Sequence, residues 1–334
     1  MGERRSCGSY LCAAPAHKTY NLRKTDVTSF LRTERRFGRH MRKAPHAISA
    51  LALAVALAAG PASAGAFFFT TGAADGRLGS LSQPAGPTTQ ETVRPGFETA
   101  DDFALTQRTR LTHATFFGLV APGTKLSDIM NVETEIYHFL PAGQATGGLV
   151  PTRVNSPTDF EIATATRDAS DGSLTFTATV LDPNFTVGNT VTSLNSGATS
   201  ALTKTGGNGA FTGEEIQFDV TFTNAIDLDP DHLFFRPQVD IANGGSFFWL
   251  SAARPSASFP VGVPDLQAWV RNDSLAPNWE RIGNDVIGAG SFNLAFSLAG
   301  DTVPEPTAWA LMILGFGGAG IQLRRRRALR DVAV

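Results

Sequence analysis

The stretches SLTFTATVL (residues 173–181) and EIQFDVTFT (residues 215–223) decide the fold class. In both, every second residue is apolar and the residues between are polar. The apolar positions are Leu174, Phe176, Ala178 and Val180 in the first stretch, and Ile216, Phe218, Val220 and Phe222 in the second. Successive side chains of a strand point to opposite faces, so this period of two predicts β-strands covered on one side only. Such strands are typical of antiparallel sheets.

Further segments support a β-rich chain. Runs that are apolar on both faces predict central strands at residues 113–120, 233–241 and 246–252, and shorter strands are expected at 132–140, 266–271 and 292–298. Glycine, proline, asparagine and aspartate separate these segments, as at residues 243–245. About ten to twelve short strands without a long amphipathic helix predict an all-β fold. We expect a single antiparallel β-sandwich with jelly-roll-like connections over residues 65–303.

The amino-terminal part has the features of an export signal. A basic start (MRK, residues 41–43) precedes an apolar stretch at residues 48–59, and Ala62-Ser63-Ala64 has the small-x-small form that signal peptidase cleaves. We therefore predict a signal peptide at residues 41–64, cut between Ala64 and Gly65. The apolar core is too short for a permanent membrane span, which favours a cleaved signal over an anchor.

Residues 1–40 precede this signal, although a signal peptide normally begins a few residues before its apolar core. They are basic and contain both cysteines, Cys7 and Cys12. Our interpretation is that translation starts at Met41 and that residues 1–40 are a gene-start artefact. The alternative is a real, long basic region in front of the signal.

The carboxyl-terminal residues 304–330 combine three elements in order. Pro304-Glu305-Pro306 precedes an apolar run at residues 307–323, and Arg324, Arg325, Arg326 and Arg327 follow. A helix rising 1.5 Å per residue needs about 20 residues to cross roughly 30 Å of hydrocarbon, so this run is marginal. Four glycines and Gln322 weaken it further. We expect a transmembrane helix over 307–323, stopped by the arginines on the cytoplasmic side. The alternative is a buried core helix with a basic end.

This tail, with PEPTAWA at residues 304–310 and LMILGFG at residues 311–317, resembles the PEP-CTERM sorting signal of exopolysaccharide-producing Gram-negative bacteria. The resemblance covers about the last 25 residues. It implies processing by an exosortase, a membrane-embedded cysteine transpeptidase-like enzyme that acts at the Pro-Glu-Pro motif. Pro304, Glu305 and Pro306 would then be a substrate site and not a catalytic one. It also implies transient anchoring in the inner membrane, followed by release to the cell surface, outer membrane or medium.

The body of the chain also looks like the β-rich domains common in such proteins. The similar stretches are residues 100–103, 115–118, 234–239 and 279–298. Those domains bring no established activity with them. This likeness supports the fold and the class of protein only. The resemblance of the tail implies an exported protein associated with the exopolysaccharide or biofilm matrix.

The charge of the predicted domain differs from that of the whole chain, whose net charge is -2. Residues 65–303 contain 12 lysines and arginines against 25 aspartates and glutamates, a net charge of -13, and no cysteine. An acidic surface disfavours nucleic acid and anionic membranes as partners and suits solubility or divalent cations. The absence of cysteine excludes a disulfide, a thiol nucleophile and a cysteine metal site in this domain.

Motifs for catalysis are missing from the sequence. It has no His-Glu-x-x-His zinc helix, no Gly-x-Ser-x-Gly elbow and no phosphate-binding loop. The three histidines of the domain, His113, His138 and His232, lie in or beside predicted strands, where structural roles are favoured. The pairs Asp101-Asp102 and Glu214-Glu215 are adjacent, so each pair points to opposite faces of a strand and is unsuited to glycosidase chemistry. We expect no enzyme, and a secreted hydrolase with an unrecognised site is the remaining alternative.

Two groups of residues suggest ligands. Asp227, Asp229 and Asp231 alternate like the start of a calcium loop, but the glycine and the distal glutamate of an EF-hand are missing, so a turn is favoured over Ca²⁺. No other cofactor is expected. Exposed tryptophan rings can pack on sugars, although burial in the core is the commoner fate of tryptophan. Carbohydrate binding through Trp249, Trp269 and Trp279 is therefore an alternative function.

Overall fold

The computed structural model describes residues 64–86, 94–144, 153–194, 204–288, 290–304 and 306–331. Residues 1–40 and nearly all of the predicted signal peptide, including Ala62, lie outside the described residues. The described strands form two sheets.

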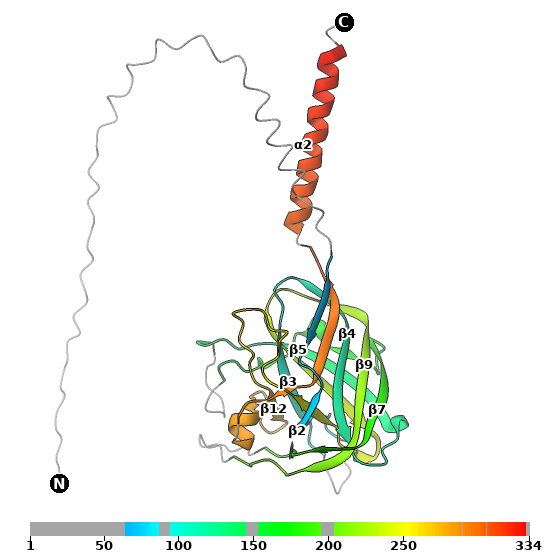
Figure 1. The fold of residues 1–334 in the computed structure, drawn as a ribbon, viewed down its shortest axis with the longest axis vertical. Coiled ribbons are helices and arrows are strands. Elements are labelled where there is room, and N and C mark those ends of the chain that lie inside the picture. The colour runs from blue at the N-terminus through cyan, green and yellow to red at the C-terminus, as the bar shows by residue number, and fades with distance from the viewer. Residues whose placement is uncertain are drawn as a thin grey trace, which may run out of the picture. The chain divides into compact units, whose positions relative to one another are not determined.

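The larger sheet has nine strands. Six follow one another in the order β1 (Ala66–Thr70), β15 (Phe296–Thr302), β4 (Thr109–Val120), β11 (Phe248–Ala252), β2 (Ala74–Leu81) and β8 (Asn189–Val191). The other three are β9 (Phe211–Leu228), which pairs with β4, β7 (Leu174–Val187), which pairs with β9, and β14 (Asn293–Leu294), which pairs with β11. Strands β4, β9 and β7 run side by side in Figure 1.

The smaller sheet has six strands. Their order is β13 (Glu280–Arg281), β12 (Trp269–Asn272), β3 (Phe97–Ala104), β10 (His232–Ile241), β5 (Ile129–His138) and β6 (Arg167–Asp168). Short helical turns lie at Leu126–Asp128, Ala163–Ala165 and Ala242–Gly244, and a π-helix lies at Ile282–Ile287. The predicted β-sandwich-like, all-β architecture is confirmed, while the jelly-roll-like connections stay a prediction.

The two stretches that decided the fold class pair with each other. Phe176 of β7 lies opposite Val220 of β9, and Ala178 lies opposite Phe218. The four predicted apolar positions of β9, at residues 216, 218, 220 and 222, are all buried, as expected. On β7 the prediction holds only at the first residues, because Val180 is 37% and Leu181 47% exposed. Strand β7 pairs only with β9 among the described strands, and its middle residues 179–184 are exposed, whereas Val187 at its end is buried.

Two expectations about the sheets need correction. The larger sheet is mixed, because β2 and β8 pair in parallel with Leu78 opposite Asn189. Strands β1, β2 and β3 were not expected. The sequence of β3, FETADDFA, carries two adjacent aspartates, and β2 contains two glycines, so both resemble turns. Pairing with neighbouring strands overrides these local preferences.

Aromatic rings fill the space between the sheets. Phe116 of β4 stacks on Phe218 of β9 with ring centroids 4.9 Å apart, and Phe247 meets both rings edge-on. Gly118 leaves the room for this ring, since a Cβ at residue 118 would coincide with the Phe247 side chain. A second aromatic group joins Phe69, Phe235 and Phe296 in the same core.

The predicted membrane segment is helical, within α2 (Pro306–Asp331). However, no helix in the described part of the chain is long and apolar enough to cross a membrane. The expected transmembrane helix over 307–323 is therefore not supported. The glycines at 315, 317, 318 and 320 and Gln322 dilute the apolar residues of this helix.

Candidate functional site

The first and last strands of the described β domain are joined at their ends. Strand β1 pairs antiparallel with β15, so that Ala66 lies opposite Asp301. Beyond this pair the Gly65 N–H donates to Thr302 Oγ1 at 2.9 Å, and the Thr302 N–H donates to the Gly65 carbonyl at 2.7 Å. The Val303 N–H donates to the carbonyl of Arg108 at 2.7 Å. The backbone is thus held by the sheet up to residue 303.

The predicted processing sites lie directly outside this junction. Ala64 and Gly65, on either side of the predicted signal-peptidase cut, are exposed. Pro304 follows Val303, the last residue that is hydrogen-bonded to the β domain, and Pro306 is the first residue of α2. Glu305 lies outside the described residues. Arg324 is exposed, whereas the side chains of Arg325, Arg326 and Arg327 are not among those described.

The family model for the PEP-CTERM protein-sorting motif matches residues 302–327. The chain carries a PEP-CTERM sorting motif. This motif implies an exported protein that is processed by an exosortase. Comparison with curated proteins and with solved structures gives no match. The sorting motif begins where strand β15 ends, so the matched segment and the β domain share only Thr302 and Val303.

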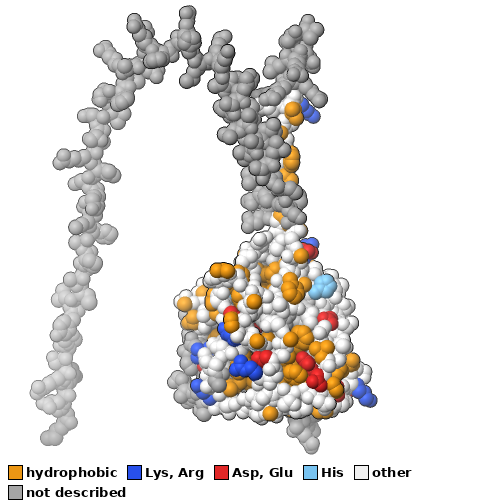
Figure 2. Space-filling model, viewed as in Figure 1, with side chains coloured by type: hydrophobic (Ala, Val, Ile, Leu, Met, Phe, Trp, Pro, Cys, Tyr) orange, Lys and Arg blue, Asp and Glu red, His pale blue; other side chains and the backbone are white. Residues whose placement is uncertain are grey.

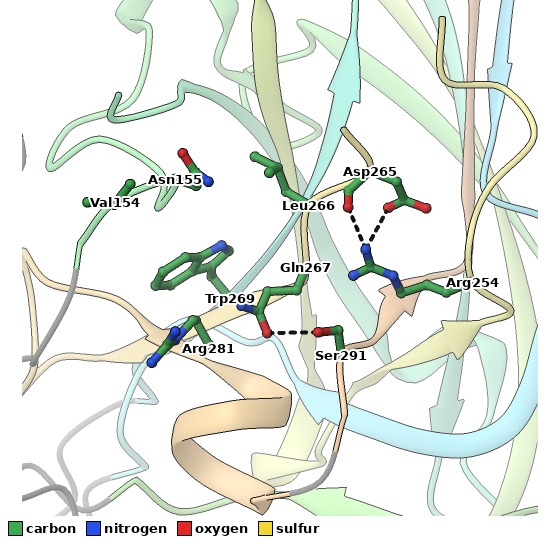
Figure 3. Close-up of a pocket in the computed structure, with 9 residues that line it drawn as sticks. All are labelled: Val154, Asn155, Arg254, Asp265, Leu266, Gln267, Trp269, Arg281 and Ser291. Carbon is green, nitrogen blue, oxygen red and sulfur yellow. Dashed lines mark hydrogen bonds and ion pairs between the residues drawn. The ribbon is translucent and has the colours of Figure 1, made fainter. Parts of the chain in front are cut away.

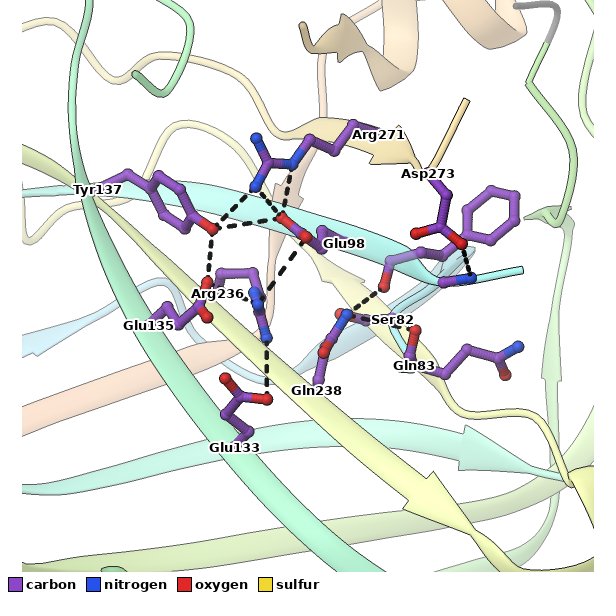
Figure 4. Close-up of polar contacts among 12 residues, drawn as sticks. Ser82, Gln83, Glu98, Glu133, Glu135, Tyr137, Arg236, Gln238, Arg271 and Asp273 are labelled. Atoms are coloured by element: carbon purple, nitrogen blue, oxygen red, sulfur yellow. Dashed lines mark hydrogen bonds and ion pairs between the residues drawn. The ribbon is translucent and has the colours of Figure 1, made fainter. Parts of the chain in front are cut away.

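A buried ionic network lies on the smaller sheet, on the face that alternation places opposite the main core. Arg236 of β10 is 4% exposed, and its guanidinium lies 2.5 Å from Glu135, 3.9 Å from Glu133 and 4.0 Å from Glu98. Arg271 of β12 contacts Glu98 at 2.5 Å. Figure 4 shows these side chains converging from β3, β5, β10 and β12.

Two aromatic side chains, Tyr137 and Trp279, contact this ionic network. The Tyr137 hydroxyl donates to Glu135 at 2.5 Å and accepts from Arg271 at 3.0 Å. The Arg271 guanidinium lies 4.3 Å from the centroid of the Trp279 ring, within cation–π range. Burial raises the pKa of Tyr137, so its proton stays in place as a donor. The network holds three carboxylates against two guanidinium groups.

Two glutamates of the smaller sheet have raised pKa values. Burial, only partly offset by Arg236, raises the pKa of Glu133 to about 7. Burial and the neighbouring Asp285 raise the pKa of Glu280 to about 7. Both carboxyl groups therefore hold protons at pH values where an exposed glutamate is ionised.

The Asp101-Asp102 pair is buried, and its side chains reach different partners. Asp101 Oδ2 accepts from the Leu294 N–H at 2.7 Å, toward the larger sheet. Asp102 Oδ2 lies 2.6 Å from His232 Nε2 and accepts from the Leu266 N–H at 3.0 Å. Burial raises the pKa of both aspartates. The expected divergence of the two side chains agrees with these contacts.

The candidate calcium aspartates contact three different side chains, two arginines and one histidine. Asp227 pairs with Arg110 at 2.9 Å, Asp229 lies 3.7 Å from Arg108, and Asp231 lies 2.7 Å from His138. Within the described ranges, no group of three or more His, Cys, Asp or Glu side chains is arranged to hold a metal ion. The three aspartates serve ion pairs at the ends of β9 and β10.

The candidate sugar-binding tryptophans are buried. Trp249 is 0%, Trp269 1% and Trp279 0% exposed. The favoured expectation, burial of these tryptophans, is therefore confirmed, and the alternative of exposed stacking rings is not supported. Trp249 and Trp279 donate through Nε1 to the carbonyls of Ala295 and Thr158, at 3.0 and 3.2 Å. Trp269 Nε1 has no partner.

The other candidate residues have local roles. His113 Nδ1 lies 2.8 Å from the Thr112 hydroxyl, in an exposed position. Glu214 accepts from the Gly123 N–H at 2.9 Å, which fixes the turn after β4. Burial and the neighbouring Asp182 raise the pKa of Glu215. These contacts link strands and turns.

Trp269 lines a pocket of about 260 Å³ beside β12 and β13. Arg254, Asp265, Gln267, Arg281 and Ser291 also line it, and Asn155 comes from a separate loop. Figure 3 shows Arg254 paired with Asp265 and Gln267 joined to Ser291. Sequence reasoning missed this site because its polar residues lie in loops without a recognisable motif.

Sequence reasoning also missed the ionic network, although a signal was present. Glu133, Glu135 and Tyr137 alternate within one strand, and Arg236 and Gln238 interrupt an apolar run. The period of two places each set on one face. Only the pairing of β10 with β5, which sets Arg236 opposite Glu135, brings the sets together.

Proposed function

We propose that this chain is the precursor of a non-enzymatic surface protein whose working part is the β domain at residues 65–303. Export and exosortase processing then deliver this domain to the cell surface, outer membrane or medium. The observation that carries the proposal is the position of the Pro-Glu-Pro tripeptide, which begins at Pro304, two residues after the last residue of β15. A cut at or after Pro304 leaves every strand of both sheets intact.

The arrangement of the two ends supports the same proposal. Strand β1 begins one residue after Gly65, so signal-peptide removal at Ala64 also spares the sheet. Both predicted cuts lie beside the hydrogen bonds that join Gly65 and Thr302. The domain between them contains no cysteine, and its core alone holds it in an oxidising compartment.

Association with an exopolysaccharide matrix is the finer part of this proposal. It is supported by the sorting motif and by the acidic composition of the domain, which suits a hydrated surface. Figure 2 shows acidic and basic side chains close together on one face of this domain. Extraction of cells with and without prior removal of the polymer tests this association. Equal amounts of protein in both extracts would remove this part of the proposal.

Mass spectrometry of the protein from cells and from medium tests the processing. We expect an amino terminus at Gly65 and a carboxyl terminus at or near Pro304-Glu305-Pro306. Glu305→Gln should leave the carboxyl-terminal segment attached, whereas Asp301→Asn, an exposed acid before the motif, should be processed normally. An intact carboxyl terminus on every wild-type molecule would overturn the sorting proposal.

The non-enzymatic role needs its own test. The purified protein is incubated with the producer's polysaccharide, and new reducing ends are measured over time. We expect no increase above a heat-denatured control. A steady release of reducing ends would instead assign the domain to the hydrolases.

A further inference from the structure

The pocket beside β12 and β13 is lined by polar atoms that have no hydrogen-bond partner among the described residues. These are the donors Trp269 Nε1 and Arg254 Nη1 and the acceptor Asp265 Oδ1, all buried. The Asp265 side chain is 8% exposed, and its Oδ1 lies 3.5 Å from Arg254 Nη2, beyond a good hydrogen bond. Figure 3 shows the Trp269 ring with Asn155 above it, Arg281 below it and Gln267 to its right.

Such groups require an explanation, because buried polar atoms in native proteins nearly always have a hydrogen-bond partner. Leaving one without a partner is unfavourable. Trp269 is 1% exposed, so bulk water does not compensate its indole N–H. A pocket lined by two unpaired donors and one unpaired acceptor suits a molecule that offers both kinds of group.

We propose that this pocket binds one neutral sugar residue. A sugar hydroxyl both donates and accepts, so neighbouring hydroxyls can donate to Asp265 and accept from Arg254 and Trp269. The volume of about 260 Å³ suits a single hexose. Trp269 borders the pocket, and Gln267, Ser291 and Asn155 offer further polar contacts.

The charges around the pocket favour a neutral ligand. Arg254 is paired with Asp265, and Arg281 makes two hydrogen bonds to Asp285, at 2.6 and 2.8 Å. Each guanidinium is thus matched by a carboxylate, which leaves no net positive charge for a phosphate or a sugar acid. A neutral polyhydroxylated ligand keeps both ion pairs and satisfies the unpaired atoms.

The test measures sugar binding by the purified full-length chain. The probes are glucose, galactose, mannose and N-acetylglucosamine, with inorganic phosphate and glucuronate as anionic comparisons. Saturation-transfer NMR and tryptophan fluorescence report binding, and we expect Kd values of about 1–10 mM for a fitting monosaccharide, as is usual for so small a ligand. Oligosaccharides with the same residue at the end or in the interior distinguish a free sugar from a polymer unit.

Two tryptophan variants make the test specific. Trp269→Phe removes a donor that has no partner among the described residues, so it should weaken binding about five- to tenfold and lower the melting temperature less than the loss of a hydrogen-bonded indole does. Trp249→Phe is the matched control, because its Nε1 donates to the Ala295 carbonyl away from the pocket. That variant should lower the melting temperature and leave sugar affinity unchanged.

The outcomes separate this proposal from the sorting proposal. Neither variant should change the positions at which the exported protein is cut, so a failure of sugar binding would leave the sorting proposal unaffected. No binding of any neutral sugar up to about 100 mM, which is far above the expected Kd, would overturn the assignment. Equal affinity of the Trp269→Phe variant and the wild type, or tighter binding of phosphate than of every sugar, would overturn it as well.

Discussion

Gly65 and Thr302, 237 residues apart in the sequence, exchange hydrogen bonds at the point where the chain enters and leaves its β domain. The Gly65 N–H reaches the Thr302 hydroxyl at 2.9 Å, and the Thr302 N–H reaches the Gly65 carbonyl at 2.7 Å. The predicted signal-peptidase site and the sorting motif are therefore neighbours in space. Both predicted cuts therefore lie beside one strand pair, β1 with β15.

Thr302→Val should loosen this junction without unfolding the domain. The variant loses the hydroxyl that Gly65 uses, while the backbone hydrogen bond from Thr302 to Gly65 remains. We expect a local loss of about 0.5–1 kcal/mol, seen as faster hydrogen exchange at the first amides of β1. Thr212→Val, which removes an exposed pair with Thr186, is the control. Unchanged exchange in β1 would contradict this role of Thr302.

Gly118→Ala should destabilise the core strongly. The added methyl group would coincide with the Phe247 ring, which packs against Phe116 and Phe218. Overpacking of this kind costs about 1–3 kcal/mol and should lower the urea midpoint. Gly188→Ala is the comparison, since its Cβ would meet only ordinary contacts. A Gly118→Ala protein as stable as the wild type would show that Phe247 can move aside.

Arg236→Met should be among the most damaging single changes on the smaller sheet. It removes the cation that lies 2.5 Å from Glu135 and within 4.0 Å of Glu98. Loss of one partner from a buried ion pair costs about 3–5 kcal/mol, because the remaining charges stay buried. Arg110→Met removes a solvent-exposed pair with Asp227 and should leave the urea midpoint almost unchanged. Similar urea midpoints for both variants would contradict the importance of the network.

The stability of the domain should fall as the pH rises from about 4.5 to above 7. The folded state holds a proton on Glu133, whose pKa is raised to about 7, whereas the unfolded chain releases it near the ordinary value of 4.5. Between these values the folded state binds more protons, so the free energy of unfolding decreases with pH. The raised pKa of Glu280 acts in the same direction and over the same window.

Glu133→Gln tests this pH dependence. In this variant the free energy of unfolding should fall with pH by about 1 kcal/mol less than in the wild type. The difference is smaller than a fully buried group would give, because Glu133 is partly exposed and screened by solvent. Urea denaturation at pH 5, 6, 7 and 8 supplies the comparison. A decline equal to that of the wild type would locate the titrating group elsewhere.

The sequence predicted the fold class well where its pattern was strictly periodic. The apolar positions of β9 are all buried, and β7 pairs with β9 as two alternating strands should. The prediction of strands failed where the local composition indicated a turn but the tertiary structure placed the segment in a sheet. Strand β3 contains Asp101 and Asp102, which resemble turn residues, yet pairing with β10 and β12 buries both.

The candidate ligand sites show the same limit. Residue type suggested that tryptophans bind sugar by stacking, but sequence gives no measure of burial, and all three are buried. Alternate aspartates suggested calcium as an alternative to a turn, but Arg108, just before β4, Arg110 of β4 and His138 of β5 approach them. The pocket at Trp269 depends on loops far apart in the chain, which no local pattern reports.

The sequence by itself determined the sorting signal of this protein. The order of motif, apolar run and arginines is local and linear, so an enzyme can read it without a folded partner. The tertiary structure alone decided which polar residues meet. Long-range strand pairing sets Arg236 among three glutamates, places Gly65 beside Thr302, and leaves Trp269, Arg254 and Asp265 with unpaired atoms around one pocket. Such contacts depend on register and burial, which are properties of the whole fold.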